Sequence, residues 1–141
     1  MKKFCFLTAY CCALYFAVAR AAGADAPQAE ILGDWRGTSK CVDLVAAPAC
    51  KDEVVLYHML PVAGATGRVL CKADKIIRGV AEPMGDIEFH YRTDTDCWES
   101  EIENPRFHAV WSFTVKGRTM TGTLVLLPDH TLVRKVATKK D

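Results

Sequence analysis

The sequence lacks an excess of charge of either sign. Its 141 residues contain 18 Lys and Arg against 17 Asp and Glu, a formal net charge of +1 at pH 7. Domains that bind nucleic acid or lie on anionic membranes carry a basic excess on one surface. The charge balance therefore indicates neither kind of partner.

The short motifs that mark common catalytic and metal sites are missing as well. There is no C-x2-C pair, no H-x-H or HExxH spacing and no G-x-S-x-G element, so neither a zinc site nor an activated serine is indicated. We expect no catalytic residue, no bound metal and no cofactor, and an enzyme is the least favoured class. We interpret the histidines as solvated surface residues, although two of them could meet across strands as a metal-binding pair. The residues considered for these roles are Ser39, Ser100, Ser112, His58, His90, His108 and His130.

The acidic segment DTDCWESEIE lacks the glycine bend of an EF-hand-type calcium loop. Its carboxylates alternate along what should be a strand, which favours a solvent-exposed strand face over a calcium site. They belong to Asp94, Asp96, Glu99, Glu101 and Glu103.

A long apolar run is present at the N-terminus, from Phe4 to Ala19, directly after Met1-Lys2-Lys3. About 16 residues are short for a membrane span, and Ala22-Gly23-Ala24 is a small-x-small cleavage site. We interpret residues 1–24 as a signal peptide, which predicts a periplasmic or secreted protein without stable membrane insertion. Without Lys2, Lys3 and Arg20, the 18 basic residues become 15 against 17 acidic ones, a net charge of −2. Residues 25–141 suit a single domain.

Seven cysteines are present, of which Cys5, Cys11 and Cys12 would leave with the signal peptide. An even number of remaining cysteines in an exported chain indicates two disulfides. Four cysteines allow three connectivities. We favour Cys41–Cys50 together with Cys71–Cys97, because Pro48 and the small residues of the first interval would let that loop close locally. A metal site built from these cysteines is disfavoured, since export favours oxidation.

The chain after residue 24 shows no helical period, whereas β-branched and aromatic residues recur in short runs between turn signals. This pattern predicts an all-β protein. The expected strands are Asp34–Cys41, Glu53–Leu60, Gly67–Ala73, Asp86–Arg92, Cys97–Ile102, Phe107–Lys116, Arg118–Leu127 and Thr131–Ala137.

Two of these strands alternate cleanly between apolar and polar residues, at Ile87–Arg92 and Phe107–Lys116. Each should have one buried and one solvated face. Eight sequential strands joined by short hairpins solve the open-edge problem by closing, which predicts an eight-stranded antiparallel up-and-down barrel. The interior of such a barrel is filled by side chains or holds one small ligand.

The expected strand Glu53–Leu60 is apolar on both faces, with Val54 and Leu56 on one side and Val55, Tyr57 and Met59 on the other. Either the N-terminal segment covers one face, or that face meets a partner.

The triplet Gly33-Asp34-Trp35 at the head of the first strand, the eight meandering strands and Arg134 in TLVRKV together resemble the lipocalin and wider calycin barrels, including small lipocalin-like exported proteins of bacteria. In that family the Gly-x-Trp tryptophan lies at the closed end of the barrel, and a basic residue from the last strand packs over its ring. The resemblance implies these structural roles for Trp35 and Arg134. The chain departs from the pattern in its shorter length and in lacking a C-terminal helix after the barrel.

Aromatic side chains would line the barrel interior if the alternation holds, and a tyrosine hydroxyl could orient a ligand. The alternative is that these rings merely fill a small core. The candidate ligand-binding residues are Tyr57, Phe89, Tyr91, Trp111 and Phe113.

Three functions remain open at this point. The first is an exported binding protein for a small apolar ligand. The second is a periplasmic protease inhibitor, because small bacterial inhibitors of metalloproteases are disulfide-bearing eight-stranded barrels with an N-terminal arm, here Asp25–Leu32. The third is an envelope protein with a filled core that binds a protein partner through the Glu53–Leu60 strand.

Overall fold

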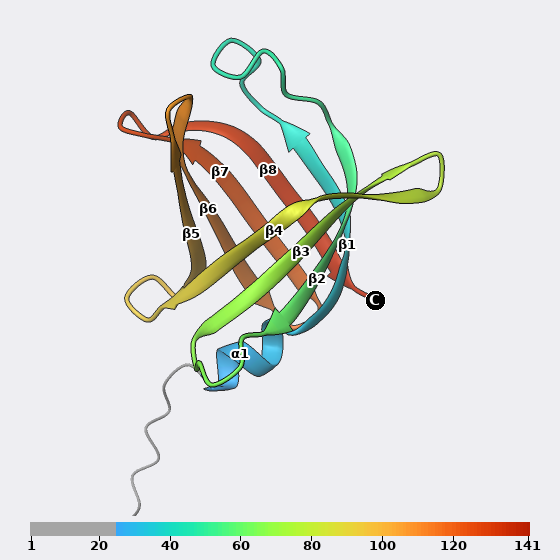
Figure 1. The fold of residues 1–141 in the computed structure, drawn as a ribbon, viewed down its shortest axis with the longest axis vertical. Coiled ribbons are helices and arrows are strands. Elements are labelled where there is room, and N and C mark those ends of the chain that lie inside the picture. The colour runs from blue at the N-terminus through green and yellow to red at the C-terminus, as the bar shows by residue number, and fades with distance from the viewer. Residues whose placement is uncertain (1–24) are drawn as a thin grey trace, which may run out of the picture.

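The computed structural model describes residues 25–141, so the predicted signal peptide with Cys5, Cys11 and Cys12 lies outside the described residues. A short helix is followed by eight strands (Figure 1). Among residues 25–141, no helix is long and apolar enough to cross a membrane. The elements are α1 (Asp25–Ile31), β1 (Gly33–Cys41), β2 (Glu53–Pro61), β3 (Arg68–Ile77), β4 (Val80–Arg92), β5 (Cys97–Asn104), β6 (Phe107–Lys116), β7 (Thr119–Leu126) and β8 (Thr131–Lys140).

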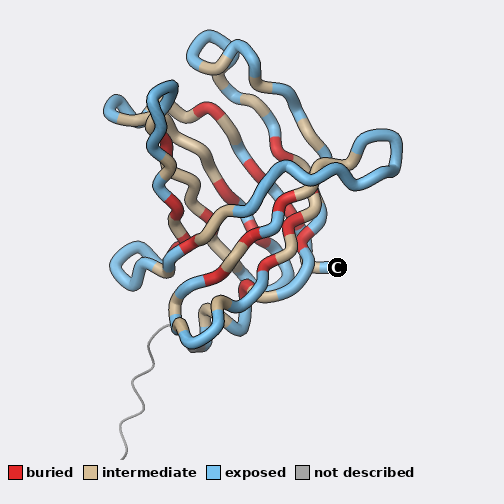
Figure 2. The backbone as a smooth tube through the Cα atoms, viewed as in Figure 1, coloured by how far each residue is buried: buried red, intermediate tan, exposed pale blue. Residues whose placement is uncertain are grey.

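The strands form a closed antiparallel barrel in chain order, with β1 hydrogen-bonded to both β2 and β8. The prediction of an eight-stranded up-and-down barrel is therefore confirmed. Buried positions alternate with more exposed ones along the strands (Figure 2). On β2, for example, Val55, Tyr57 and Met59 are each less than 5% exposed.

The hairpin of β3 and β4 is longer than predicted. The sequence suggested strands ending at Ala73 and restarting at Asp86, but pairing continues to Ile77 and Val80, after a register shift between Ala73 and Asp74. The turn is Arg78-Gly79, and both residues have positive φ (51° and 82°), as a two-residue type I′ hairpin turn requires. The hairpin projects from the barrel on the side away from α1 (Figure 1).

Helix α1 lies across one end of the barrel (Figure 1). Ile31 at its end is fully buried in the core. The Gln28 side chain accepts a hydrogen bond from the Gly67 amide in the β2–β3 loop (2.8 Å). The expectation of no helix is wrong for this segment. The segment that the inhibitor hypothesis needs as an arm is helical and docked against the barrel.

Trp35 is fully buried at the same end, and its indole Nε1 donates a hydrogen bond to the Ile31 carbonyl (2.7 Å). The prediction that Arg134 packs over this ring is wrong. Lys140 takes that place, with Nζ 5.2 Å from the ring centroid. The β1–β8 register explains the difference, because Trp35 pairs with Lys140, whereas Arg134 pairs with Cys41, six residues and roughly 20 Å further along β1.

The N-terminal segment does not cover the outer face of β2, so the first of the two alternatives given for this strand is wrong. Val54 is 46% exposed and Leu60 is 38% exposed. The segment closes the end of the barrel instead of packing on its wall.

The structure contains a disulfide between Cys41 and Cys50, as predicted, which pins the β1–β2 loop. The predicted second bond is wrong, because Cys71 and Cys97 are free and buried. Cys71 pairs with Ile87 on β4, whereas Cys97 pairs with Arg92. These partners lie five residues apart, roughly 16 Å along the strand, and a disulfide requires Cα atoms within about 7 Å.

This arrangement predicts one disulfide and two thiols in the folded, oxidised protein. After denaturation without reductant and alkylation, peptide mapping should find alkylated Cys71 and Cys97 and a linked Cys41–Cys50 peptide. A linked Cys71–Cys97 peptide would contradict the structure.

Replacing Trp35 with alanine should lower the free energy of unfolding by about 3–5 kcal/mol, because it leaves a cavity and removes the hydrogen bond to Ile31. Denaturant unfolding measures the change. The control is Arg36→Ala, next in the chain but half-exposed on the outside with an ion pair to Asp141 (3.4 Å), which should change stability by about 0.5 kcal/mol or less. An unchanged midpoint for Trp35→Ala would show that this end of the barrel does not depend on the indole.

Candidate ligand-binding cavity

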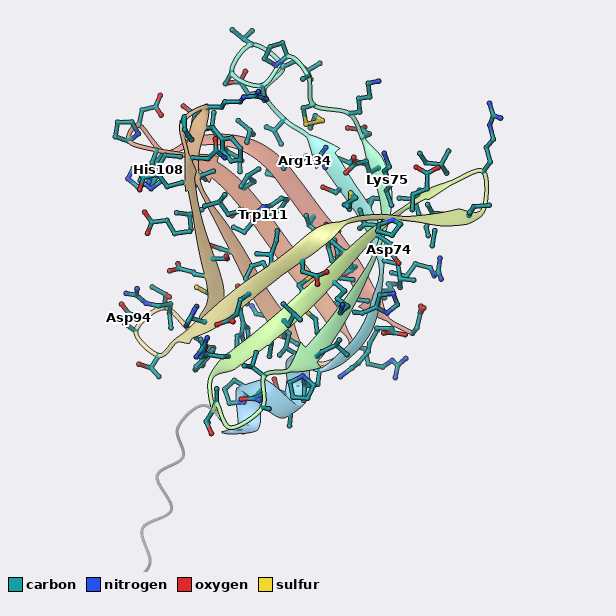
Figure 3. All side chains as sticks on the ribbon, viewed as in Figure 1. Asp74, Lys75, Asp94, His108, Trp111 and Arg134 are labelled. Atoms are coloured by element: carbon teal, nitrogen blue, oxygen red, sulfur yellow. A yellow bond between two sulfur atoms is a disulfide. The ribbon has the colours of Figure 1, made fainter. Side chains whose placement is uncertain are left out.

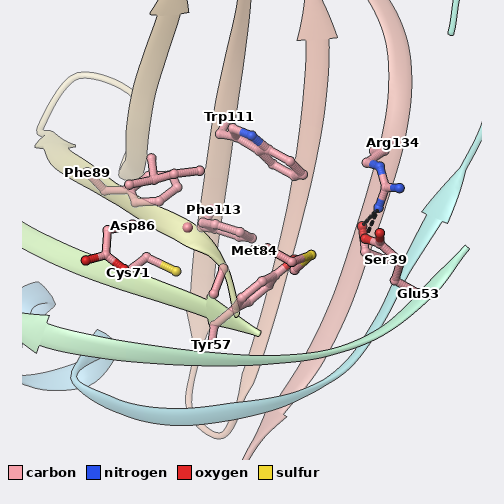
Figure 4. Close-up of a pocket in the computed structure, with 13 residues that line it drawn as sticks. Ser39, Glu53, Tyr57, Cys71, Met84, Asp86, Phe89, Trp111, Phe113 and Arg134 are labelled. Atoms are coloured by element: carbon pink, nitrogen blue, oxygen red, sulfur yellow. Dashed lines mark hydrogen bonds and ion pairs between the residues drawn. The ribbon is translucent and has the colours of Figure 1, made fainter. Parts of the chain in front are cut away.

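The barrel holds an interior cavity of about 340 Å³ on the side away from α1 (Figure 4). Its wall combines aromatic and aliphatic side chains with one charged group of residues. The lining residues are Ser39, Glu53, Tyr57, Cys71, Ala73, Met84, Gly85, Asp86, Ile87, Phe89, Trp111, Phe113 and Arg134.

Four of the five predicted ligand-binding aromatics meet in this cavity, around Phe113. The ring centroid of Phe113 lies 5.1 Å from that of Phe89, 5.6 Å from that of Tyr57 and 6.0 Å from that of Trp111. The first two contacts are tilted and the third is stacked, which are the favoured geometries for aromatic pairs. In Figure 3 Trp111 and Arg134 lie over the barrel interior, whereas Asp94 and His108 lie at its margin.

Gly122 on β7 makes room for this cluster. A Cβ atom at that position would lie 2.3 Å from the Phe113 ring, which no side chain can tolerate. The absence of a side chain on β7 thus sets where the central ring of the cavity wall sits.

Tyr91, the fifth predicted residue, does not line the cavity. It lies nearer α1, where its ring packs on Trp98 with centroids 5.2 Å apart. Its hydroxyl donates a hydrogen bond to the Asp96 carboxylate, which raises the pKa of the phenol. Tyr91 faces inward as the alternation predicted, but it belongs to the closed end of the barrel.

Arg134 forms the charged side of the cavity. Its Nη1 donates to Ser39 Oγ (2.5 Å) and Glu53 Oε2 (3.0 Å), and its Nη2 donates to the Lys51 carbonyl (2.5 Å). The Arg134 side chain is only 13% exposed and the Glu53 side chain is 25% exposed. The ion pair is therefore largely removed from water and held by the strands β1, β2 and β8.

Sequence reasoning missed Ser39 and Glu53. Glu53 has the same strand parity as Val55, Tyr57 and Met59, so the alternation of β2 already placed it on the inner face. An inward carboxylate in a small barrel needs a basic partner, and this requirement pointed to Arg134.

Cys71 contributes a thiol to the cavity wall. Burial, and to a lesser degree the nearby Asp86 carboxylate, raises the pKa of this thiol to about 12. The side chain is therefore a neutral, weakly polar part of the wall at physiological pH.

Several apolar side chains are exposed at the end of the barrel opposite α1. They lie in the disulfide loop, on the outer part of the β3–β4 hairpin and at the start of β6, and include Val45, which is 95% exposed. An apolar molecule approaching this end meets apolar surface first. These residues are Val42, Leu44, Val45, Ile77, Val80, Met84 and Phe107.

Among neighbouring strands of the barrel, β4 and β5 pair over the fewest positions. These strands pair over three positions, His90↔Glu99, Tyr91↔Trp98 and Arg92↔Cys97, whereas β5 and β6 pair over seven. Pro83 and Gly85 lie in the part of β4 that has no partner on this side, and proline is tolerated on such edges. A groove lies along this gap. Asp86 and Ile87 line both the groove and the interior cavity.

The histidines lie at or near the outer surface. His58 on β2 bridges two carboxylates, with Nδ1 2.7 Å from Asp34 Oδ1 and Nε2 3.4 Å from Asp74 Oδ2. The hydrogen bond to Asp34 is the main reason why the pKa of His58 is raised. Within residues 25–141, no group of three or more His, Cys, Asp or Glu side chains is arranged to hold a metal ion.

Comparison of the chain with protein-family models, with curated proteins and with solved structures finds no match.

The raised pKa of His58 makes a prediction about stability and pH. A folded-state pKa above the unfolded value means that the protonated ring stabilises the fold below about pH 6.5, and that this contribution is lost as the pH rises through the folded-state pKa. His58→Gln should therefore destabilise the protein more at about pH 5.5 than at about pH 9, as measured by denaturant unfolding. His130→Gln, in the exposed β7–β8 turn, is the control, because it removes a histidine without removing the contacts with Asp34 and Asp74. Equal losses for His58→Gln at both pH values would contradict the assignment.

Proposed function

We propose that this barrel binds a small apolar ligand in its interior cavity. The observation that carries the proposal is an unfilled volume of about 340 Å³ walled by Tyr57, Phe89, Trp111 and Phe113. The pocket opens to solvent, and a barrel that existed only for stability would gain by closing it with side chains, because burial of apolar surface is favourable.

The size of the cavity limits the ligand. Small-molecule pockets in proteins span about 300–1,000 Å³, so this one lies at the lower end. One aromatic ring or a short alkyl chain with a small polar group fits, and a diacyl lipid does not.

The polar cluster of Ser39, Glu53 and Arg134 would orient such a ligand. A few placed polar groups in an otherwise apolar pocket are the usual source of specificity. The apolar loops at the open end and the gap between β4 and β5 offer two routes of entry.

A substitution that fills the cavity should abolish binding without harming the fold. Ala73 lines the cavity and is 8% exposed, so Ala73→Leu should occupy ligand space and keep or raise the melting temperature. We expect the affinity for 2-phenylethanol, measured by calorimetry, to fall at least about tenfold, equivalent to about 1.4 kcal/mol.

The matched control is Ala81→Leu, on the exposed part of β4. It adds the same side chain outside the cavity and should bind like the parent protein. Unchanged binding by Ala73→Leu would place the ligand elsewhere. Native mass spectrometry of the protein isolated from its own cells would show a bound molecule directly.

A further inference from the structure

Carboxylates outnumber the cationic groups around the cavity. Glu53 and Asp86 line it, and Arg134 is the cation among the lining residues. Asp86 is half-exposed and its Oδ2 lies 3.3 Å from Lys72 Nζ, so Glu53 is the carboxylate that faces the interior. The terminal nitrogens of Arg134 already donate to Ser39, Glu53 and the Lys51 carbonyl. Glu53 accepts the hydrogen bond from Arg134 through Oε2. Its other oxygen, Oε1, can accept a hydrogen bond from a ligand.

The aromatic wall has the same preference. The faces of the Tyr57, Phe89, Trp111 and Phe113 rings carry the negative part of the ring quadrupole, which attracts cations and disfavours anions. A ligand ammonium group between these faces and Glu53 Oε1 would be attracted by both, and the Arg134 guanidinium group, bound to Oε2 of the same carboxylate, would offset part of this attraction.

The gap between β4 and β5 supplies a second indication, which shares Asp86 with the first. The groove in it is lined by the carboxylates Asp86, Glu88 and Glu101, together with His90. Each of these carboxylates forms an ion pair with a basic residue. The partners are Lys72 for Asp86, Arg68 for Glu88 and His108 for Glu101. These partners do not line the groove, whereas His90 does and lies 3.4 Å from Glu88 Oε1. The three carboxylates are 33–61% exposed, so oxygens outside these ion pairs can accept from a molecule that approaches the cavity from the side.

We propose that the ligand is an organic cation, a primary amine on a single-ring or short apolar body, which approaches through the acidic groove between β4 and β5. This inference rests on the proposed function. The apolar body would contact the rings around Phe113, and the ammonium group would donate to Glu53 Oε1. A carboxylate ligand would instead have to displace Glu53 from Arg134, leaving a buried carboxylate without its partner.

Three probes with the same phenyl body test the charge preference: 2-phenylethylamine, 2-phenylethanol and 3-phenylpropanoate. Calorimetry with the folded protein should show the ammonium compound binding about tenfold more tightly than the alcohol, and the anion binding most weakly. Equal affinity for amine and alcohol, or tightest binding of the anion, overturns the inference and leaves the proposed function standing. Absence of binding by all three probes overturns both.

Two substitutions locate the effect. Glu53→Gln should remove most of the preference for the amine over the alcohol. Because Glu53→Gln could also loosen Arg134, Asp86→Asn provides a half-exposed second position, where the same preference should fall by a smaller factor. Asp94→Asn, in the β4–β5 turn at the other end of the barrel, is the charge-matched control and should leave the preference unchanged. A preference that survives both Glu53→Gln and Asp86→Asn overturns the inference.

Discussion

The closure between β1 and β8 is the contact on which the rest of the structure depends. It brings the first and last strands together over seven residue pairs, and it is sterically demanding. At Gly37 a Cβ atom would lie 2.0 Å from the Ala137 carbonyl oxygen, so only glycine lets the two backbones approach at this point. The same strand carries Trp35 at the closed end and Ser39 at the cavity. A change in the β1–β8 register would therefore disturb the closed end and the charged cluster together.

The two ends of the barrel differ in how their interiors are packed. Near α1, the large side chains of Trp35, Met59 and Trp98 are each 2% exposed or less. Towards the other end the wall includes the small residues Ala73 and Gly85, and β4 separates from β5. Trp35, Met59 and Trp98 thus lie at one end of the barrel, and the cavity lies towards the other.

Much of this barrel could be predicted from the sequence, because strand alternation and turn residues are local signals. They identified the eight strands and the inner positions Tyr57, Phe89, Trp111 and Phe113. The Arg78-Gly79 turn is also a local signal, and it was available but overlooked. The partner of Trp35 and the state of Cys71 and Cys97 could not be obtained in this way. Both depend on how far apart strands place residues along their axes, and this register is set by hairpins and bulges distributed over the whole chain.

Arg134 shows how register decides the role of a side chain. The residue has the inward orientation on β8 that a resemblance to lipocalin barrels implied, but it lies six residues from the position opposite Trp35. At that depth the guanidinium group cannot reach the indole, and the inward carboxylate of Glu53 becomes its partner instead. Lys140, opposite Trp35, covers the ring. The consequence extends to the proposed ligand binding, since an arginine paired with Glu53 is a weak site for anions, whereas an unpaired one would be a strong site. The pairing of charged groups in the cavity thus follows from the register between β1 and β8.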